Sequence, residues 1–289
     1  MRAFFFGMGY SSQAAALAIR ELAPGASIAG TTRSDERLAS LSQGSTRVHV
    51  FDGARPGDTL GDDLRRSTHV VISIPPTETN DPVLTHHAAD LDAAPDLTWL
   101  CYYSTVGVYG DFGGEWVDEN APTNPVNRRS MQRVKIEQDW RDYAARRDVP
   151  LTILRLAGIY GPRRSALDKL REGTARRIVK PGQVFNRIHV ADIGRITGLA
   201  AQRRLAGTFN LADDEPAPPQ EVIEYAARAM HLPVPPDIDF ETADMTPMAR
   251  SFYSDNKRVS NAAIKAALGV ELLYPNYRVG LDALKGEKS

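Results

Sequence analysis

The amino-acid sequence predicts an α/β protein with a doubly wound parallel sheet and a smaller C-terminal lobe. Short apolar runs alternate with amphipathic stretches through the first half, which is the pattern of βαβ units. A glycine-rich turn directly follows the first apolar run. The pattern loosens after about residue 213, where prolines flank one amphipathic helix. The length of 289 residues suits one large domain or two closely packed ones.

The first half of the chain is expected to supply most of the sheet. The expected strands are 2–6, 27–32, 47–51, 69–74 and 98–104. The expected helices between them are 13–22, 35–41 and 82–91. The spacing of apolar residues follows a helical period in the helices, whereas the strands are short continuous apolar runs.

The second half is expected to complete the sheet and then form the lobe. A helix at 132–147 precedes a strand at 151–156, and a helix at 189–205 precedes a strand at 208–212. Further helices are expected at 220–231, 259–268 and 276–284. The predicted dinucleotide-binding domain comprises 1–157 and 186–213. The predicted substrate lobe comprises 158–185 and 214–289.

The turn after the first strand reads Gly7-Met8-Gly9-Tyr10-Ser11-Ser12. A Rossmann-type turn needs one glycine for a tight bend, a second for close approach of a pyrophosphate, and a small third residue for helix packing. Gly7 and Gly9 meet the first two needs, and Ser12 stands where glycine or alanine is usual. Tyr10, Ser11 and Ser12 begin a helix, whose N–H groups and dipole favour phosphate. We therefore predict a nicotinamide dinucleotide site at this turn.

The residues after the second and third strands bear on the choice of cofactor. The segment 31–34 offers no acid for the ribose 2′-hydroxyl of NAD, whereas Arg33 suits the 2′-phosphate of NADP. A charge-assisted hydrogen bond contributes about 1.5–3 kcal/mol, or roughly 10- to 150-fold in affinity. The sequence thus favours NADP over NAD; the alternative is that Arg33 only faces solvent. Asp52 either binds the adenine amino group or caps a turn.

Three later segments contain recognisable motifs: residues 103–110 are similar to S-[ST]-x-x-V-Y-G, 155–162 to R-x-x-x-x-Y-G-P, and 187–192 to I-H-V-x-D. With these motifs the chain resembles the extended short-chain dehydrogenases/reductases, the group of nucleotide-sugar epimerases and dehydratases. The motifs stand in the family's order, and the resemblance covers residues 1 to about 215. It implies a catalytic Ser or Thr, a Tyr and a Lys, and we expect substrate to bind in the cleft between sheet and lobe.

The catalytic tyrosine that this resemblance implies is missing. Thr105 matches the Ser/Thr position and Lys135 the lysine of Y-x-x-x-K, but Met131 occupies the tyrosine position. In the family, the tyrosine hydroxyl moves a proton as hydride moves to or from the nicotinamide, and the lysine holds the nicotinamide ribose. Methionine has no titratable group, and loss of a general acid–base costs about 10²–10⁴ in rate. We expect Met131 to border the nicotinamide pocket.

Other side chains are candidates to replace the tyrosine: Tyr102, Tyr103, Tyr109, Tyr160, Arg129, Arg133, Asp118 and Glu119. In the family, the tyrosines matching Tyr109 and Tyr160 are mostly structural. The loop that matches Asp118 and Glu119 often approaches substrate there. Arg163 and Arg164 are candidates to bind a phosphate or carboxylate of the substrate, with a solvated surface as the alternative.

The whole profile is closest to atypical members of the superfamily that lack the tyrosine, and 257–261 and 274–281 resemble C-terminal segments of that subgroup. Two hypotheses stay open. The protein is an NAD(P)-dependent epimerase, dehydratase or reductase with a nonstandard proton donor, or it is a non-catalytic NADP-binding scaffold or redox sensor. The family resemblance also suggests a homodimer formed through paired helices, including the helix that carries Lys135.

Composition argues against several other partners. The net charge of −1 shows no basic excess for nucleic acid. No apolar run approaches the roughly 20 residues that span a bilayer, and no signal peptide is recognisable, so we expect a cytoplasmic protein. His86 and His87 point about 100° apart on a helix, and we expect no metal site. His189 is expected to have a structural role at a helix start.

Overall fold

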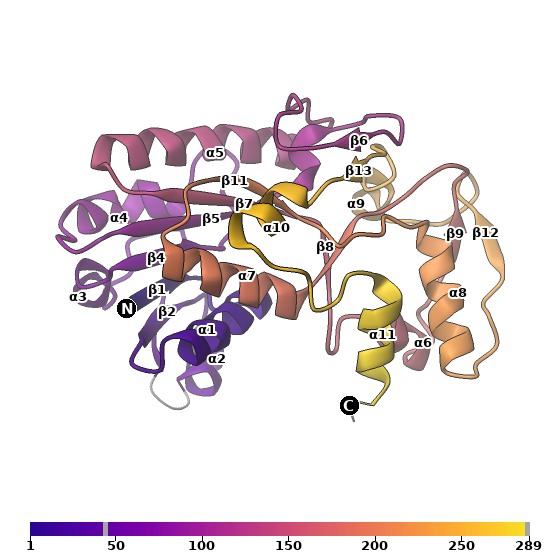
Figure 1. Cartoon of the computed structure of the whole chain (residues 1–289), viewed down its shortest axis with the longest axis horizontal. Helices are drawn as coiled ribbons and strands as arrows, with labels where there is room; N and C mark the ends of the chain where they lie inside the picture. Colours follow the sequence, from indigo (N-terminus) through magenta and orange to yellow (C-terminus); the bar gives the residue numbers. More distant parts are fainter. Residues whose placement is uncertain (43–45, 287–289) are drawn as a thin grey trace. The chain divides into compact units, whose positions relative to one another are not determined.

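The computed structural model describes residues 1–42 and 46–286. These residues include a seven-stranded sheet with spatial order β3-β2-β1-β4-β5-β7-β11. Its strands are β1 (Arg2–Phe6), β2 (Ser27–Thr32), β3 (Thr46–Val50), β4 (His69–Ile72), β5 (Trp99–Thr105), β7 (Leu151–Leu156) and β11 (Gly207–Leu211). The pairs β1–β2, β1–β4, β2–β3 and β4–β5 are parallel. The predicted Rossmann-type sheet is therefore confirmed (Figure 1).

Helices connect the strands and cover the sheet (Figure 1). They are α1 (Tyr10–Leu22), α2 (Asp35–Leu41), α3 (Gly61–Arg65), α4 (Pro82–Asp92), α5 (Arg128–Arg147) and α7 (Val190–Arg203). Successive residues of a strand face opposite sides of a sheet. Phe4 and Phe6 thus join the core formed with α3, α4 and α5, while Phe5 is buried on the opposite face. Helices α1 and α7 pack closely at Gly194. A Cβ at this position would lie only 2.7 Å from the backbone of Ala14, so a larger residue would not fit.

The predicted elements agree with the structure best in their interiors. β1, β2, β7 and α2 have the predicted bounds. Helix α1 begins at Tyr10 and not at 13, and α5 begins at Arg128 and not at 132. The residues before the predicted starts, 10–12 and 128–131, are mostly polar, so they show no apolar period to mark them. Helix α3 was not predicted, because Gly61–Arg65 spans little more than one turn.

The chain divides into two compact units. The first comprises Met1–Thr105, Met131–Arg155 and Ile193–Phe209. The second comprises Val106–Ser130, Leu156–Asp192 and Asn210–Ser289. The division expected from the sequence, 1–157 with 186–213 and 158–185 with 214–289, stays a prediction.

The second unit contains short elements around its own core. They are a 3-10 helix (Val106–Tyr109), β6 (Trp116–Val117), β8 (Gly158–Tyr160), α6 (Ala166–Arg171), β9 (Arg177–Val179), β10 (Arg187–His189), α8 (Pro219–Ala229), β12 (Asp237–Asp239), α9 (Pro247–Ser251), β13 (Arg258–Val259), α10 (Ala262–Leu268) and α11 (Tyr277–Lys285). Leu167, Ala226 and Leu281 from α6, α8 and α11 belong to one apolar cluster. The helix expected at 259–268 begins only at Ala262, because β13 before it pairs with β6.

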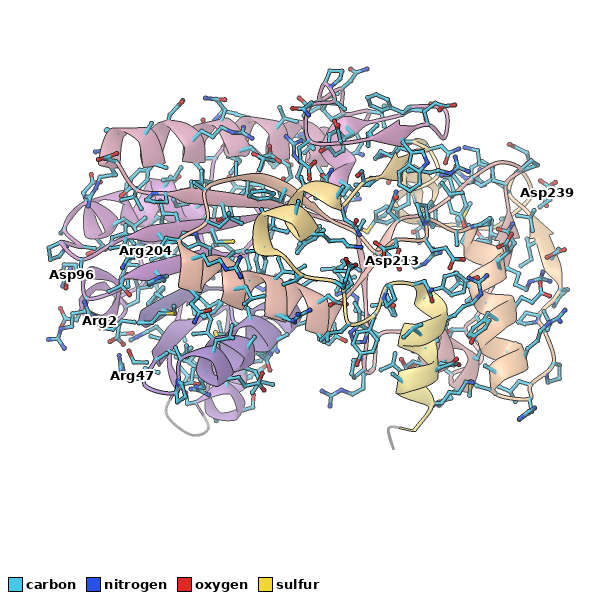
Figure 2. All side chains as sticks on the ribbon, viewed as in Figure 1. Arg2, Arg47, Asp96, Arg204, Asp213 and Asp239 are labelled. Carbon is cyan, nitrogen blue, oxygen red and sulfur yellow. The ribbon has the colours of Figure 1, made fainter. Side chains whose placement is uncertain are left out.

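Charged side chains form ion pairs on the surface of the first unit. Arg2 at the start of β1 pairs with Asp96 at 2.7 Å, and both residues are labelled in Figure 2. Within residues 1–42 and 46–286, no helix is long and apolar enough to cross a membrane.

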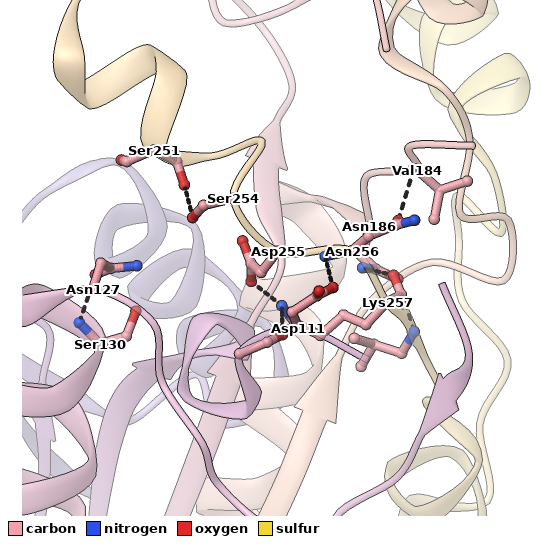
Figure 3. A network of polar contacts seen from close by, with 12 residues as sticks. Asp111, Asn127, Ser130, Val184, Asn186, Ser251, Ser254, Asp255, Asn256 and Lys257 are labelled. Carbon is pink, nitrogen blue, oxygen red and sulfur yellow. Dashed lines mark hydrogen bonds and ion pairs between the residues drawn. The ribbon is translucent and has the colours of Figure 1, made fainter. Parts of the chain in front are cut away.

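A polar network in the second unit is centred on Asn256 (Figure 3). The Asn256 N–H donates to Asp111 Oδ1 at 2.8 Å, and the Val184 N–H donates to Asn256 Oδ1 at 3.0 Å. Lys257 is buried, and its Nζ donates to the carbonyl oxygen of Gly110 at 2.8 Å. Asn256 and Lys257 therefore hold together segments that lie far apart in the sequence.

Candidate cofactor site

The glycine turn lies where the strand order of the sheet reverses. β1 has β2 on one side and β4 on the other, so the chain leaves β1 at the topological switch point. Ligands of doubly wound sheets bind outside the carboxyl ends of the strands at that point. The turn of Gly7 to Gly9 follows the carboxyl end of β1 and leads directly into α1.

Gly7 makes the tight bend that the sequence predicts. Its φ of +93° lies in the region that favours glycine. A Cβ at this position would lie 2.7 Å from Ile74 Cγ2 and 2.9 Å from Ser73 Oγ. The N–H of Gly7 donates to Thr31 Oγ1 at 2.9 Å, and the N–H of Met8 donates to the Thr31 carbonyl at 2.7 Å. The bend is therefore closed to any larger residue.

Gly9 leaves room where a pyrophosphate would approach. It is the N-cap of α1, and no atom lies within 4 Å of a Cβ built on it. The first turn of α1 contains Tyr10, Ser11 and Ser12 and no acid. The first N–H groups of a helix have no partner within the helix and carry the positive end of its dipole. The residues present therefore fit the phosphates of a dinucleotide.

Ser12, the unusual third residue of the turn, has a polar partner. Its side chain is buried, and its hydroxyl donates to Ser73 Oγ at 2.8 Å. A buried hydroxyl without a hydrogen bond is unfavourable. This neighbour, which directly follows β4, therefore explains how serine is accommodated where glycine or alanine is usual.

Arg33 and Asp52 follow the carboxyl ends of β2 and β3. Both side chains are exposed. Asp52 Oδ1 accepts the N–H of Ala54 at 2.8 Å. This is the geometry of a turn cap, the second of the two roles that the sequence allows for Asp52.

The structure places the matches to the catalytic residues in the first unit. Thr105 ends β5 and is half-buried. Met131 and Lys135 lie four residues apart on α5, and residues at this spacing share one helix face. Met131 is 54% exposed, so it does not fill the core. Lys135 Nζ pairs with Asp139 Oδ2 at 2.6 Å.

The four tyrosines considered as substitutes are all buried. Each hydroxyl has a hydrogen-bond partner: Tyr102 with Arg133, Tyr103 with Thr197, Tyr109 with Asn210, and Tyr160 with the backbone carbonyl of Asn276. Burial raises the pKa of Tyr102, Tyr103 and Tyr160 well above the ordinary tyrosine value. Burial therefore makes these three hydroxyls poorer general bases than an ordinary tyrosine.

The charged substitutes also have structural partners. Arg133 Nη1 donates to the Tyr103 carbonyl at 2.6 Å, which joins α5 to the carboxyl end of β5. In the second unit, Asp118 Oδ1 accepts the N–H of Asn120 at 2.9 Å. Glu119 Oε1 accepts the N–H of Asn210 at 2.7 Å.

Three arginines named from the sequence lie at the surface. Arg129 is exposed near the start of α5. Arg163 and Arg164 are exposed in the second unit, and Arg163 has a φ of +59°. They belong to a turn in which the N–H of Arg164 donates to the Gly161 carbonyl at 3.0 Å. This turn presents both residues to solvent.

The histidines have structural partners. His189 Nδ1 accepts the N–H of Ala191 at 3.2 Å at the start of α7, and burial lowers the pKa of His189 to about 4. His87 accepts the N–H of Gly57 at 3.1 Å and contacts Asp90 at 3.0 Å. Across the described residues, no three His, Cys, Asp or Glu side chains gather in a group that could hold a metal ion.

Sequence reasoning missed one buried network beside the catalytic matches. Glu137 on α5 is 1% exposed and accepts the Ser104 hydroxyl at 2.6 Å. Arg155 on β7 donates to both carboxylate oxygens of Glu137, at 3.1 and 2.8 Å. Arg141 adds a bond at 3.0 Å. The sequence feature that could have revealed this network is Glu137 itself, a charged residue on the apolar stripe of α5.

Comparison with known proteins places the chain in a family. A functionally unknown conserved protein from Silicibacter pomeroyi DSS is 46% identical over 98% of both chains, with a TM-score of 0.88. The family model for NAD dependent epimerases/dehydratases matches residues 84–212. The chain belongs to the NAD dependent epimerase/dehydratase family. Its resemblance to the extended short-chain dehydrogenases/reductases is confirmed.

Other structures resemble this epimerase/dehydratase chain over its whole length. A Methylobacillus flagellatus protein provisionally assigned to the NAD-dependent epimerases/dehydratases is 26% identical over 98% of this chain and 97% of its own, with a TM-score of 0.74. UDP-glucose 4-epimerase from Thermus thermophilus, in complex with NAD, is 18% identical over 99% of both chains, with a TM-score of 0.73. The second likeness shows a shared fold. A comparison with curated proteins finds no match.

Proposed function

We propose that this protein binds NADP and acts as an oxidoreductase or epimerase on a polar small molecule, such as a nucleotide sugar, with a proton donor other than tyrosine. The open glycine turn carries this proposal. No atom lies within 4 Å of a Cβ on Gly9, which directly precedes a helix without an acid in its first turn. The Thermus thermophilus relative of the same fold is a UDP-glucose 4-epimerase in complex with NAD.

Each part of the cofactor is assigned to a small set of residues. The turn of Gly7 and Gly9 and the start of α1, residues 10–12, bind the pyrophosphate. Arg33 pairs with the 2′-phosphate, and Lys135 holds the nicotinamide ribose. When bound, the nicotinamide supplies the hydride chemistry. Thr105 hydrogen-bonds the reacting substrate group, as its match to the family's Ser/Thr position implies.

The preference for NADP is tested by calorimetry with both cofactors. Arg33→Ala is expected to weaken NADP binding roughly 10- to 150-fold, because a charge-assisted hydrogen bond is lost. NAD binding is expected to stay unchanged. Arg37→Ala is the matched control, since Arg37 is also exposed but lies on α2. Equal affinities for NADP and NAD in the unchanged protein would refute the preference.

Whether the protein catalyses a reaction is tested at the position of the missing tyrosine. Met131→Tyr restores the family's Y-x-x-x-K pair on one face of α5, so it is expected to raise hydride transfer, while Lys135→Ala is expected to abolish it. The assay follows reduced nicotinamide by absorbance with nucleotide sugars as substrates. If neither change alters any turnover while NADP still binds, the catalytic assignment fails.

A second candidate function is a non-catalytic NADP-binding scaffold or redox sensor. Burial raises the pKa of Tyr102, Tyr103 and Tyr160, which supports this candidate because it makes each hydroxyl a weaker replacement for the missing base. It predicts that the protein binds oxidised and reduced NADP with different affinities and shows no turnover. Equal affinities for the two forms would exclude the redox sensor.

The substrate residues and the assembly are also proposals. Arg163 and Arg164 are assigned to an anionic group of the substrate, and Asp118 to a polar group of it. Replacing both arginines by alanine is expected to weaken substrate binding and leave NADP binding unchanged. The protein is proposed to form a homodimer through α5, which sedimentation at micromolar concentration tests.

A further inference from the structure

Gly7 is held by two hydroxyl side chains, one from each side of β1. Thr31 lies in β2, and its Oγ1 accepts the N–H of Gly7 at 2.9 Å. Ser73 directly follows β4, and its hydroxyl donates to the Gly7 carbonyl oxygen at 2.8 Å. The same hydroxyl lies 3.0 Å from the Phe6 carbonyl oxygen. Since β1 lies between β2 and β4, the two hydroxyls reach the same residue from opposite neighbours. The N–H and the carbonyl of Gly7 are thus both occupied.

These contacts begin where the ladder of the sheet ends. Residue pairing of β1 with β2 stops at Phe5 and Gly30, and pairing with β4 stops at Phe6 and Ile72. Gly7 has a positive φ, so its peptide groups turn away from the direction of the ladder. Buried backbone groups require hydrogen-bond partners. Side-chain hydroxyls supply them at this point.

The same two residues reach beyond Gly7 to the rest of the turn, Thr31 through its backbone carbonyl and Ser73 through its hydroxyl. The Thr31 carbonyl accepts the N–H of Met8 at 2.7 Å. Ser73 Oγ accepts the hydroxyl of Ser12 at 2.8 Å, which joins the first turn of α1 to the end of β4. The bend and the helix start are thus tied to both neighbouring strands, while the space beside Gly9 stays open.

We infer that Thr31 and Ser73 are positioning residues for the pyrophosphate of the dinucleotide, and that together they form a hydroxyl clamp on Gly7. The clamp holds the turn in its open form before the cofactor arrives, so that binding does not have to order it. The inference rests on the proposed function, because it assumes that a dinucleotide binds at this turn. Neither residue has to touch the cofactor to affect its affinity.

The test measures binding to Thr31→Val, Ser73→Ala and Thr31→Ser. Valine has the shape of threonine without the hydroxyl, whereas serine keeps the hydroxyl. The control is Thr98→Val, since the Thr98 hydroxyl donates to the Thr68 carbonyl at 3.1 Å where the amino ends of β4 and β5 meet. The probes are NADP and ADP, which contain a pyrophosphate, and adenosine 2′-monophosphate, which does not.

We expect Thr31→Val to weaken binding of NADP and ADP about tenfold, the effect of one lost hydrogen bond. Ser73→Ala should weaken it by about tenfold or more, because the Ser73 hydroxyl also contacts the Phe6 carbonyl and the Ser12 hydroxyl. Binding of adenosine 2′-monophosphate should stay within about twofold of the unchanged protein. Thr31→Ser should restore most of the affinity. Thr98→Val should lower the melting temperature without changing binding of either pyrophosphate probe.

Three results would overturn the clamp. In the first, the protein without substitutions binds ADP, and Thr31→Val and Ser73→Ala bind it equally tightly. This result would leave the proposed function standing. Another is an equal loss of binding in Thr98→Val, which would indicate general destabilisation. A third is failure of the unchanged protein to bind NADP and ADP, which removes the proposed function as well. Where Thr31→Val does not fold, Ser73→Ala decides by the same criteria.

Discussion

Removal of the buried carboxylate of Glu137 is expected to destabilise the protein strongly. Its side chain is 1% exposed, and that of its partner Arg155 is 6% exposed. In Glu137→Ala the guanidinium of Arg155 loses both bonds to the carboxylate and stays buried. The Ser104 hydroxyl loses its 2.6 Å partner as well.

The magnitude follows from the burial of the pair. Breaking a buried ion pair from one side costs about 3–5 kcal/mol, because an uncompensated charge is left behind. A domain is typically stable by only about 5–15 kcal/mol, so Glu137→Ala should remove a large fraction of the total. Arg141, the third partner, is 37% exposed, and Arg141→Ala should cost only about 0.2–1 kcal/mol, as for exposed pairs.

Urea unfolding followed by circular dichroism measures these differences. The decisive comparison adds the double variant Glu137→Leu with Arg155→Met, which removes both charges. We expect the double variant to be more stable than Glu137→Leu alone, because no buried charge is left unpaired. The reasoning is refuted if Glu137→Ala changes the free energy of unfolding by less than about 1 kcal/mol. It is also refuted if the double variant loses as much stability as Glu137→Leu and Arg155→Met lose in sum when each is made alone.

Three further predictions concern a proton and two glycines. Burial raises the pKa of Asp213, labelled in Figure 2, to about 8. The folded state therefore keeps a proton that the unfolded chain loses above about pH 4, and stability falls as pH rises from 4 to 8. Asp213→Asn should raise stability by a few kcal/mol at pH 8, at roughly 1.4 kcal/mol per pKa unit, and by nothing at pH 4. Denaturant unfolding at both values checks this, and a gain equal at both would contradict it. Gly9→Val should abolish NADP binding in calorimetry while changing stability by no more than about 1 kcal/mol; unimpaired binding would refute the role of the open turn. Gly280→Ala should cost about 1–3 kcal/mol by crowding, because its Cβ would overlap the Tyr160 hydroxyl oxygen. Thermal unfolding should show partial recovery when Tyr160→Phe is added, and no recovery would refute the steric cause.

Most of the sheet could be predicted because its strands are apolar on both faces. A run such as Phe4-Phe5-Phe6 excludes an exposed face, and the glycines after it place the first crossover. The short elements of the second unit could not be found in this way. Segments such as β8 and β12 have three residues each, too few for a period to appear, and partner strands far along the chain define them.

The candidate site was predictable only where its residues are local in sequence. The spacing of Gly7 and Gly9 predicts an open turn, and the four-residue spacing of Met131 and Lys135 shows by itself that methionine occupies the tyrosine position. The partner of Ser12 could not be read in the same way. Ser73 lies 61 residues away, and no local pattern links the two.

The sequence alone determined the class of the fold, the place of the glycine turn and the absence of a tyrosine before Lys135. These depend on composition and spacing within one or two elements. Only the tertiary structure decided that Tyr102 and Tyr103 are buried and that Glu137 pairs with Arg155. It also decided that Thr31 and Ser73 hold Gly7 from both sides. The physical reason is that a polar atom's partner and its exposure depend on which distant segments fold against it.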